Sequence, residues 1–398
     1  MNQKIIIHHL ELSKTTLNLS GGEKAMIEFV SYFQKNGYKN VIYSSETAKM
    51  AYSKLKDFKD VDHVVIGRIC WERINPFFAY FLRFFQLFLG LRKFPKAINI
   101  ILMHEDFLPT TIFGFLLKII NPQSKGFLVF HLKSPRIRYG FMGEFANKKY
   151  PISLSIVRFW LEQNLSLLLS RWVRGIVAVN PFYKPFLLKK FPSNKVYSLP
   201  VFGGSDIPEN NDQSKDEKVY DLVFMARFQK LKGLDDLLEI FDYVRKEKPE
   251  LTLAIIGGGY SDVEKKLTDY ILGSGLNNQI KYFGYLTGNE KYDILLRSKV
   301  FVLPSYFESY GLVRLEAASC ALPTVSYDLP TYKIFGDENL IVAPIGDKVM
   351  LAQQIIKLLN DKVYYESKKK AAKELSGRFS WSNTALELEK IIFDEKKL

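Results

Sequence analysis

The chain has 398 residues, of which 47% are hydrophobic and 25% charged, so it can fill the cores of two or three ordinary domains and is not a disordered chain. Its two cysteines, Cys70 and Cys320, lie far apart, which excludes a disulfide framework or a zinc site and favours a reducing cytoplasm. The longest apolar stretch, residues 76–91, is interrupted by Arg83 and Gln86. It is shorter than the roughly 20 apolar residues of a membrane-spanning helix, and the N-terminus does not resemble a signal peptide.

Charge is distributed unevenly along the chain. Residues 1–200 hold 29 Lys and Arg against 12 Asp and Glu, a net charge of +17, whereas residues 201–398 carry −3. This asymmetry indicates an anionic partner for the first half. Because no nucleic-acid-binding module is visible, a membrane surface or a phosphorylated substrate is favoured over nucleic acid.

The first half opens with a βαβ pattern. A short β-branched run at residues 5–7 is followed by a loop with Gly21 and Gly22, by an apolar helical pattern at residues 25–36 and by a strand at residues 41–43. Further strands are predicted at 64–66, 98–103, 127–130 and 176–179. We therefore expect an open parallel sheet with helices on both faces.

A polar segment at residues 206–218 is typical of a linker, and a second βα series follows it. Strands are predicted at 222–225, 252–256, 281–283, 300–303 and 324–326, with a helix at 234–246. The expected fold class is α/β, with two Rossmann-like, doubly wound domains over residues 1–205 and 219–379. In such pairs a ligand is expected at the carboxyl ends of the strands, in the cleft between the domains.

The segment LSGGE, at residues 19–23, resembles the signature of ABC-type ATPases. An ATPase also needs a G-x-x-x-x-G-K-[ST] motif well upstream, and this chain has no such motif. The alternatives are a plain strand-to-helix turn or a glycine loop at which the backbone approaches a ligand. Free amides at a helix N-terminus attract anions, which favours the second interpretation for Gly21 and Gly22.

The second half carries a constellation suited to a nucleotide. Arg227 ends a predicted strand and Lys232 precedes a helix, so the two cations could hold a diphosphate. Glu308 and Glu316 lie eight positions apart across Gly311, where a helix is expected to begin. A glutamate on a largely buried helix needs hydrogen-bond partners, and ribose hydroxyls would supply them.

One histidine of the first half belongs with this constellation. His131 follows the apolar strand at 127–130 and would face the same cleft, with a purely structural role as the alternative.

With these residues the sequence resembles the retaining glycosyltransferases of family 4, which have the GT-B fold. The segment FESYGLVRLEAASCALPTV resembles their E-x7-E motif, and RFQKLKG resembles their R-x4-K pair. FSWSNTALELEKII resembles their closing segment, so a helix at residues 380–398 is expected to pack back onto the first domain. The resemblance is strongest over 219–330, and it departs from the family at Val201–Gly204, where an asparagine–glycine pair is common.

The resemblance implies a role for each matched position. Arg227 and Lys232 would bind the diphosphate of a UDP- or GDP-sugar, Glu316 its ribose, and Glu308 and His131 the reacting sugar. The residues implied at the nucleotide sugar as a whole are Gly21, Gly22, Arg227, Lys232, Ser309, Tyr310, Gly311, Leu312, Val313 and Glu316. No cofactor or metal is implied, because cations and amides can stabilise the leaving diphosphate and no Asp-x-Asp motif is present.

The activity implied is that of a hexosyltransferase that builds a surface polysaccharide or glycolipid on a glycan or lipid-linked acceptor. A sugar-nucleotide epimerase of the same fold and a non-catalytic, membrane-docked partner remain alternatives.

Two basic, aromatic segments of the first half bear on localisation. Residues 71–96 predict a helix with one narrow polar stripe, either packed on the sheet or lying on a membrane surface. Residues 133–150 place Lys133, Arg136 and Arg138 among aromatic residues, as an ordinary loop or as a contact with the acceptor or an anionic membrane. We therefore expect a cytoplasmic protein that binds the inner face of the membrane.

Overall fold

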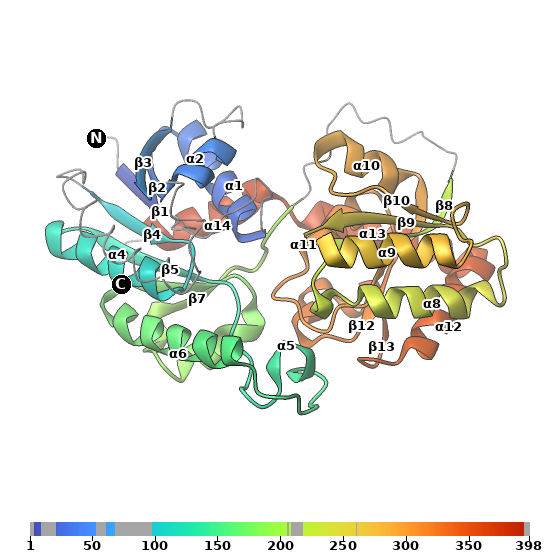
Figure 1. The fold of residues 1–398 in the computed structure, drawn as a ribbon. Helices are drawn as coiled ribbons and strands as arrows, with labels where there is room; N and C mark the ends of the chain where they lie inside the picture. The colour runs from blue at the N-terminus through green and yellow to red at the C-terminus, as the bar shows by residue number, and fades with distance from the viewer. Residues whose placement is uncertain are drawn as a thin grey trace. The chain divides into compact units, whose positions relative to one another are not determined.

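The structure is a computed structural model that describes residues 4–8, 21–52, 61–67, 98–204, 207, 218–259 and 261–393 (Figure 1). Residues 71–96 and nearly all of the predicted linker lie outside the described residues. The chain divides into two compact units. The first unit comprises Met1–Ser134, Leu154–Phe202 and Trp381–Leu398, and the second comprises Pro135–Ser153 and Gly203–Ser380.

A parallel sheet forms the centre of the first unit, with strand order β3-β2-β1-β4-β5-β6-β7. Its strands are β1 (Lys4–His8), β2 (Lys39–Ser45), β3 (Asp62–Gly67), β4 (Ile100–Met103), β5 (Lys125–Phe130), β6 (Gly175–Ala178) and β7 (Val196–Ser198). Strands β4 and β6 are buried at every position, as expected for parallel strands covered on both faces.

The sequence predicted two helices among the described residues of the first unit, one at 25–36 and one at 380–398. The helices found there are α1 (Gly21–Lys35), α2 (Glu46–Tyr52), α4 (Leu108–Ile120), α6 (Leu154–Leu169), α7 (Lys184–Leu188) and α14 (Trp381–Phe393), with 3-10 turns η4 (Ser170–Trp172), η5 (Pro181–Tyr183) and η6 (Ser193–Lys195). Helix α1 buries the apolar side that its periodicity predicts, but it begins at Gly21 rather than at residue 25. Gly21 and Gly22 therefore form the first turn of a helix.

Helix α14 packs against α1. Glu389 of α14 accepts hydrogen bonds from the hydroxyls of Tyr32 at 2.8 Å and Tyr38 at 2.7 Å, and the ring of Tyr38 stacks on Phe393. Burial, followed by the hydrogen bond to this carboxylate, raises the pKa of each tyrosine to about 12. Glu389 thus anchors the last helix of the chain to the first unit, next to which the sequence expected it.

Replacing Glu389 by alanine is expected to lower the free energy of unfolding by about 2–3 kcal/mol, because two hydrogen bonds to a charged group are lost. The matched control is Glu387→Ala on the same helix. Among the described residues Glu387 pairs with Lys390 alone, three residues further on, so its loss should cost less than about 0.5 kcal/mol. Urea denaturation measures both variants, and equal losses would contradict the anchoring role.

The second unit is built on another parallel sheet, of order β10-β9-β8-β11-β12-β13. Its strands are β8 (Tyr220–Arg227), β9 (Leu253–Gly258), β10 (Ile280–Tyr282), β11 (Ser298–Leu303), β12 (Thr324–Tyr327) and β13 (Ile341–Ala343). Its helices are α5 (Gly140–Gly143), α8 (Leu234–Arg245), α9 (Ser261–Gly273), α10 (Gly288–Leu296), α11 (Leu312–Ser319), α12 (Lys348–Asn360) and α13 (Lys362–Arg378), with 3-10 turns η7 (Lys230–Lys232), η8 (Pro330–Phe335) and η9 (Asp337–Asn339).

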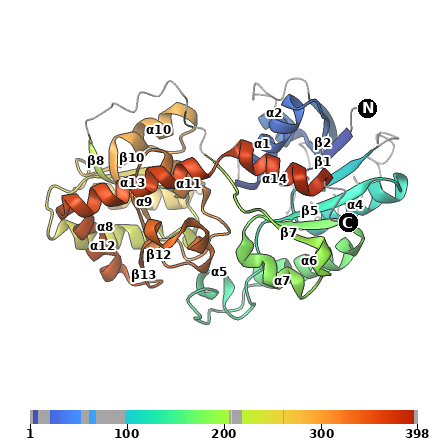
Figure 2. The ribbon, with the colours of Figure 1, turned by 180° about the vertical axis from the view of Figure 1, so that it is seen from behind.

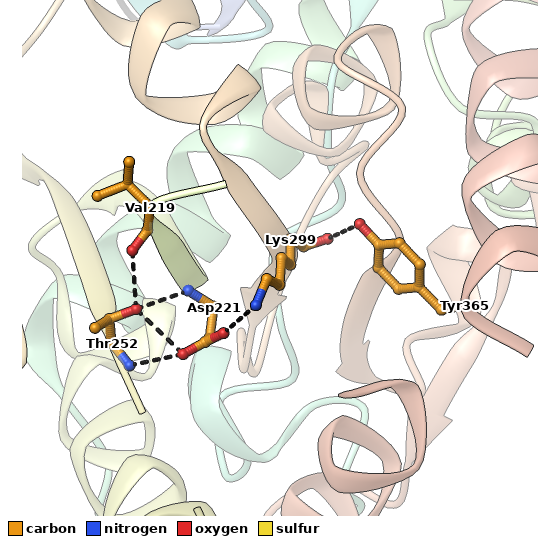
Figure 3. A network of polar contacts seen from close by, with 5 residues as sticks. All are labelled: Val219, Asp221, Thr252, Lys299 and Tyr365. Atoms are coloured by element: carbon orange, nitrogen blue, oxygen red, sulfur yellow. Dashed lines mark hydrogen bonds and ion pairs between the residues drawn. The ribbon is translucent and has the colours of Figure 1, made fainter. Parts of the chain in front are cut away.

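A polar network ties the amino ends of three strands of this sheet together (Figure 3). Asp221 in β8 accepts hydrogen bonds from the backbone of Thr252, just before β9, at 3.0 Å and from Lys299 in β11 at 2.7 Å. Tyr365 of α13 donates to the carbonyl of Lys299. The network braces the end of the sheet opposite to the one at which parallel α/β sheets bind ligands.

The two parallel sheets confirm the predicted α/β class. Residues 135–153 lie in the second unit, although the sequence assigned them to a first domain of 1–205. The reason is aromatic packing, because Phe141 and Phe145 both contact Phe307 of the second unit. Within the described residues, no helix is both long and apolar enough to cross a membrane.

Candidate functional site

Two loops meet at the carboxyl end of the second sheet. One follows β8 and includes η7, and the other follows β11 and leads to α11. The backbone amide of Tyr306 donates to the carbonyl of Leu231 at 2.9 Å. Gly233 has a φ of +74°, and a Cβ there would lie 2.1 Å from the carbonyl oxygen of Pro304, so only glycine allows this approach. The loops that carry the predicted site residues are therefore held against each other.

Lys232 and Glu308 form an ion pair between these loops. Lys232 Nζ lies 2.6 Å from Glu308 Oε1, and Glu308 is only 8% exposed. The sequence assigned these residues separately, to the diphosphate and to the donor sugar, and the structure brings them into direct contact. Because a buried carboxylate without a partner is costly, the lysine stabilises Glu308 at this position.

Glu316, on α11, is paired in a similar way. Its Oε1 lies 3.0 Å from Nζ of Lys291 on α10, and both side chains are largely buried. From the sequence, ribose hydroxyls were expected to be the hydrogen-bond partners of the Glu316 carboxylate. In the structure Lys291 is already one such partner. Nothing in the sequence pattern distinguishes Lys291 from other helical lysines, so only the structure identifies it.

The N-terminus of α11 is open. Gly311 precedes the helix with φ of +86°, and a Cβ there would lie 3.0 Å from the ring of Tyr332. No described residue accepts a hydrogen bond from the backbone amides of Gly311, Leu312 or Val313. These amides and the helix dipole therefore give the start of α11 a positive partial charge, and the binding of a ligand there stays a prediction.

The side chains just before α11 differ in exposure. Ser309 is half-buried, whereas Tyr310 is buried with its ring against Phe335 and Phe379. Tyr310, which the sequence placed at the nucleotide sugar, therefore packs into the core with its ring.

The side chain of Arg227 lies in a different environment from that of Lys232. It is the last residue of β8, its backbone pairs with Gly258 of β9, and its side chain is exposed. Within the described part of the chain, its guanidinium has no hydrogen-bond or ion-pair partner. Of the two predicted phosphate-binding cations, Arg227 is thus available and Lys232 is already engaged.

The structure also shows a buried arginine next to the site that the sequence analysis did not identify. Arg314, on α11, is buried, donates from Nη1 to Ser326 Oγ at 3.0 Å and lies over the ring of Tyr332. Burial lowers the pKa of Arg314 to about 10, so it remains charged at neutral pH. The hydroxyl of Tyr332 is buried beside Gly311, and no described residue is its partner.

Asp236 fixes the loop that precedes Glu308. The hydroxyl of Tyr306 donates to Asp236 Oδ2 at 2.7 Å, and Tyr327 donates to the same oxygen. Burial, followed by this hydrogen bond, raises the pKa of Tyr306. The sequence analysis missed Asp236, because an acidic residue in the first turn of a helix is ordinary in soluble proteins.

Two of the cations in the basic segment after His131 contact other residues of the chain. Arg136 pairs with Glu144 at 3.2 Å and its guanidinium lies 3.8 Å from the centre of the Tyr139 ring. Lys133, in the first unit, lies over the ring of Phe186, whereas Arg138 is exposed. Of the three cations predicted to contact an acceptor or membrane, Arg136 is therefore engaged within its own segment.

In the first unit the structure brings Gly22 and His131 together. A Cβ at Gly22 would lie 3.7 Å from the imidazole of His131. Nε2 of His131 lies 2.8 Å from the carbonyl oxygen of His104, which fixes the proton on Nε2 and orients the ring. Gly21 is exposed at the start of the same helix.

Gln163 of α6 braces the strand ends beside His131. Its Nε2 donates to Asp106 Oδ2 and to the carbonyl of Leu132 at 2.8 Å, and its Oε1 accepts from the amide of Ser134 at 2.7 Å. Burial raises the pKa of Asp106 to about 7. Neither residue was identified from sequence.

Known proteins resemble this chain in sequence and in fold. Residues 206–375 match the family model of glycosyl transferases group 1. An uncharacterized glycosyltransferase of Methanocaldococcus jannaschii is 23% identical over 78% of each chain. A glycogen synthase of Mycobacterium tuberculosis is matched over only 40% of its own length.

Solved structures show the same fold at low identity. Sucrose-phosphate synthase from Thermosynechococcus elongatus superposes with a TM-score of 0.75 at 15% identity and 98% coverage of both chains. Anabaena HepE, in complex with UDP-glucose, superposes with a TM-score of 0.71 at 15% identity, covering 99% of this chain and all of HepE. The matched domain and the fold define the class of protein, a glycosyltransferase with the GT-B fold.

Proposed function

We propose that the protein is a retaining glycosyltransferase of the family 4 type. It moves a sugar from a UDP- or GDP-sugar to a glycan or lipid-linked acceptor, in the synthesis of a surface polysaccharide or glycolipid. The observation that carries the proposal is the positive charge at the carboxyl end of the second sheet. There Arg227 and the amides at the start of α11 are open to a ligand.

The diphosphate is the natural ligand of these groups. Arg227 and the amides of Leu312 and Val313 bind its oxygens, and Lys232 serves both Glu308 and the diphosphate. Negative charge grows on the leaving diphosphate as the bond to the anomeric carbon breaks. Donors fixed in advance stabilise this charge in the transition state.

The two glutamates of the E-x7-E motif hold the rest of the donor. Glu316 binds the ribose hydroxyls beside Lys291, and Glu308 binds hydroxyls of the transferred sugar. His131 contacts the same sugar, and Gly21 and Gly22 allow the backbone to approach it. Arg227, Lys232 and the helix amides take the part that a divalent cation plays elsewhere, so we propose that the reaction needs no metal.

The acceptor side is assigned to Lys133 and Arg138, since Arg136 already pairs with Glu144. We propose that the protein works in the cytoplasm, where nucleotide sugars are made. A sugar-nucleotide epimerase remains the second candidate, because the same donor site would serve it without an acceptor.

A donor panel tests the proposal. Thermal-shift binding with UDP-, GDP-, ADP- and TDP-sugars in EDTA is expected to give one stabilising class for the wild type, and Glu316→Ala is expected to lose it. Lack of binding by every donor would contradict the proposal. NMR of the bound donor without acceptor then detects epimerisation, and NMR of the product with acceptor shows whether the anomeric configuration is retained.

A further inference from the structure

Helix α6 of the first unit buries polar residues and exposes apolar ones, which is the reverse of an ordinary surface helix. Its buried residues include Glu162, Gln163 and Ser166. Its exposed apolar residues are Leu154, Trp160, Leu161, Leu165, Leu168 and Leu169. A surface helix normally turns its apolar stripe toward the core, so the exposed apolar side of α6 is a candidate binding surface.

The exposed leucines form one continuous stripe, here called the leucine face. Leu154, Leu161, Leu165 and Leu168 are separated by seven, four and three residues, which places them on one side of a helix. Leu154 is 84% exposed and Leu168 is 53% exposed. The stripe therefore runs the length of α6, and its four leucines are between 49% and 84% exposed.

The orientation of α6 is fixed from the inside. Gln163 makes three hydrogen bonds to Asp106, Leu132 and Ser134 at the strand ends beside His131. A rotation that buried the leucines would expose Gln163 and break these bonds. The outward leucine face is thus a consequence of the same contacts that brace the strand ends of the first unit.

The charged residues near α6 indicate which kind of partner would bind the leucine face. Residues 151–202 contain seven basic side chains and one acidic side chain, Glu162, which is buried. Arg158 is exposed one turn beyond Leu154, and Lys190 lies beside α6, where its Nζ donates to Asn164 at 3.0 Å. Basic residues therefore predominate in this segment, and two of them, Arg158 and Lys190, lie on or beside α6, which suits an anionic surface.

Neighbouring elements extend the apolar surface. Helix α4 exposes Ile119 and Ile120, and its Phe115 lies with its ring 6.3 Å from that of Trp172, just after α6. Leu188, at the end of α7, is also exposed. Figure 2 shows α6 and α7 in the same green part of the first unit.

We propose that the leucine face of α6 docks the protein on an anionic lipid surface. The leucines and Trp160 insert at the boundary between headgroups and acyl chains, and the surrounding cations meet lipid phosphates. A second copy of the chain fits less well, because a two-fold contact through this face would set its positive charges against each other. The docking does not depend on the proposed enzymatic activity.

Co-sedimentation of the full chain with vesicles tests the proposal. Binding is expected to vesicles of phosphatidylglycerol and phosphatidylethanolamine, and to weaken on vesicles of phosphatidylcholine or at high salt. Leu161→Glu with Leu165→Glu should reduce the partition coefficient by at least about tenfold, because two carboxylates must enter the interface. The control pair, Leu272→Glu with Val363→Glu, changes exposed apolar residues of the second unit and should bind as the wild type does.

Thermal stability is measured for each variant, and a pair with serine in place of glutamate is used if Leu161→Glu with Leu165→Glu lowers it. Three results would overturn the proposal. They are absence of wild-type binding to anionic vesicles, wild-type binding by the α6 variants, and a dimer in sedimentation velocity that these variants dissociate while vesicle binding is absent.

Discussion

Replacing Arg227 by methionine is expected to lower kcat/KM by about 10²–10³-fold, because a fixed cation opposite the leaving diphosphate is lost from the transition state. Stability should change by less than about 0.5 kcal/mol, since the exposed guanidinium has no partner within the described residues. The loss should appear mainly in kcat if Arg227 acts as negative charge develops, and in KM if it only binds the donor.

The matched control for Arg227 is Arg297→Met. Arg297 is also exposed in the second unit, at the end of α10, and its backbone carbonyl accepts hydrogen bonds from Val219 and Tyr220. Its side-chain charge should be dispensable. Equal losses in the two variants would indicate general electrostatic attraction of the donor, and full activity of Arg227→Met would remove this residue from the diphosphate site.

Replacing Glu316 by alanine is expected to weaken donor binding by about 10–100-fold, because hydrogen bonds to a charged group contribute roughly 1.5–3 kcal/mol each. It should also destabilise the fold by about 3–5 kcal/mol, because Lys291 is left buried without its carboxylate. Isothermal titration with the donor and urea denaturation measure the two effects separately.

Lys291→Met separates these two effects. It breaks the same ion pair, and hence lowers stability to a similar extent, but it leaves the carboxylate of Glu316 in place for the ribose. Donor affinity should therefore fall much less than in Glu316→Ala. If both variants lose affinity equally, Glu316 acts only by holding α11 in position and the ribose role is wrong.

The segment that carries Glu308 and Glu316 shows which features a local sequence pattern can predict. An apolar strand, a loop with Gly311 and a helical period predict a helix that begins near residue 311, and α11 begins at Leu312. Leu315 and Ala318 lie three positions apart on this helix, and both are buried. Short-range periodicity determined these features because each depends on residues within one or two turns.

Two short strands were not predicted, because local periodicity needs more residues than they have. Strands β7 and β13 have three residues each and lie at the edges of their sheets. Three residues cannot establish a period, and their formation depends on the neighbouring strand rather than on their own pattern. Boundaries moved as well, since α1 includes Gly21 and Gly22, which the sequence placed in a loop.

The sequence by itself determined the α/β class and most strands of both sheets, since these follow from periodicity. It also placed Arg227 and Lys232 at the end of a strand, and their binding of phosphate stays a prediction. Only the tertiary structure decided which side chains pair with each other. Lys232 with Glu308, Lys291 with Glu316 and Asp236 with Tyr306 join residues 76, 25 and 70 positions apart. The outward leucines of α6 likewise follow from contacts of Gln163 with distant strands. Pairings between side chains that far apart are set by how whole elements pack, and no local pattern contains that information.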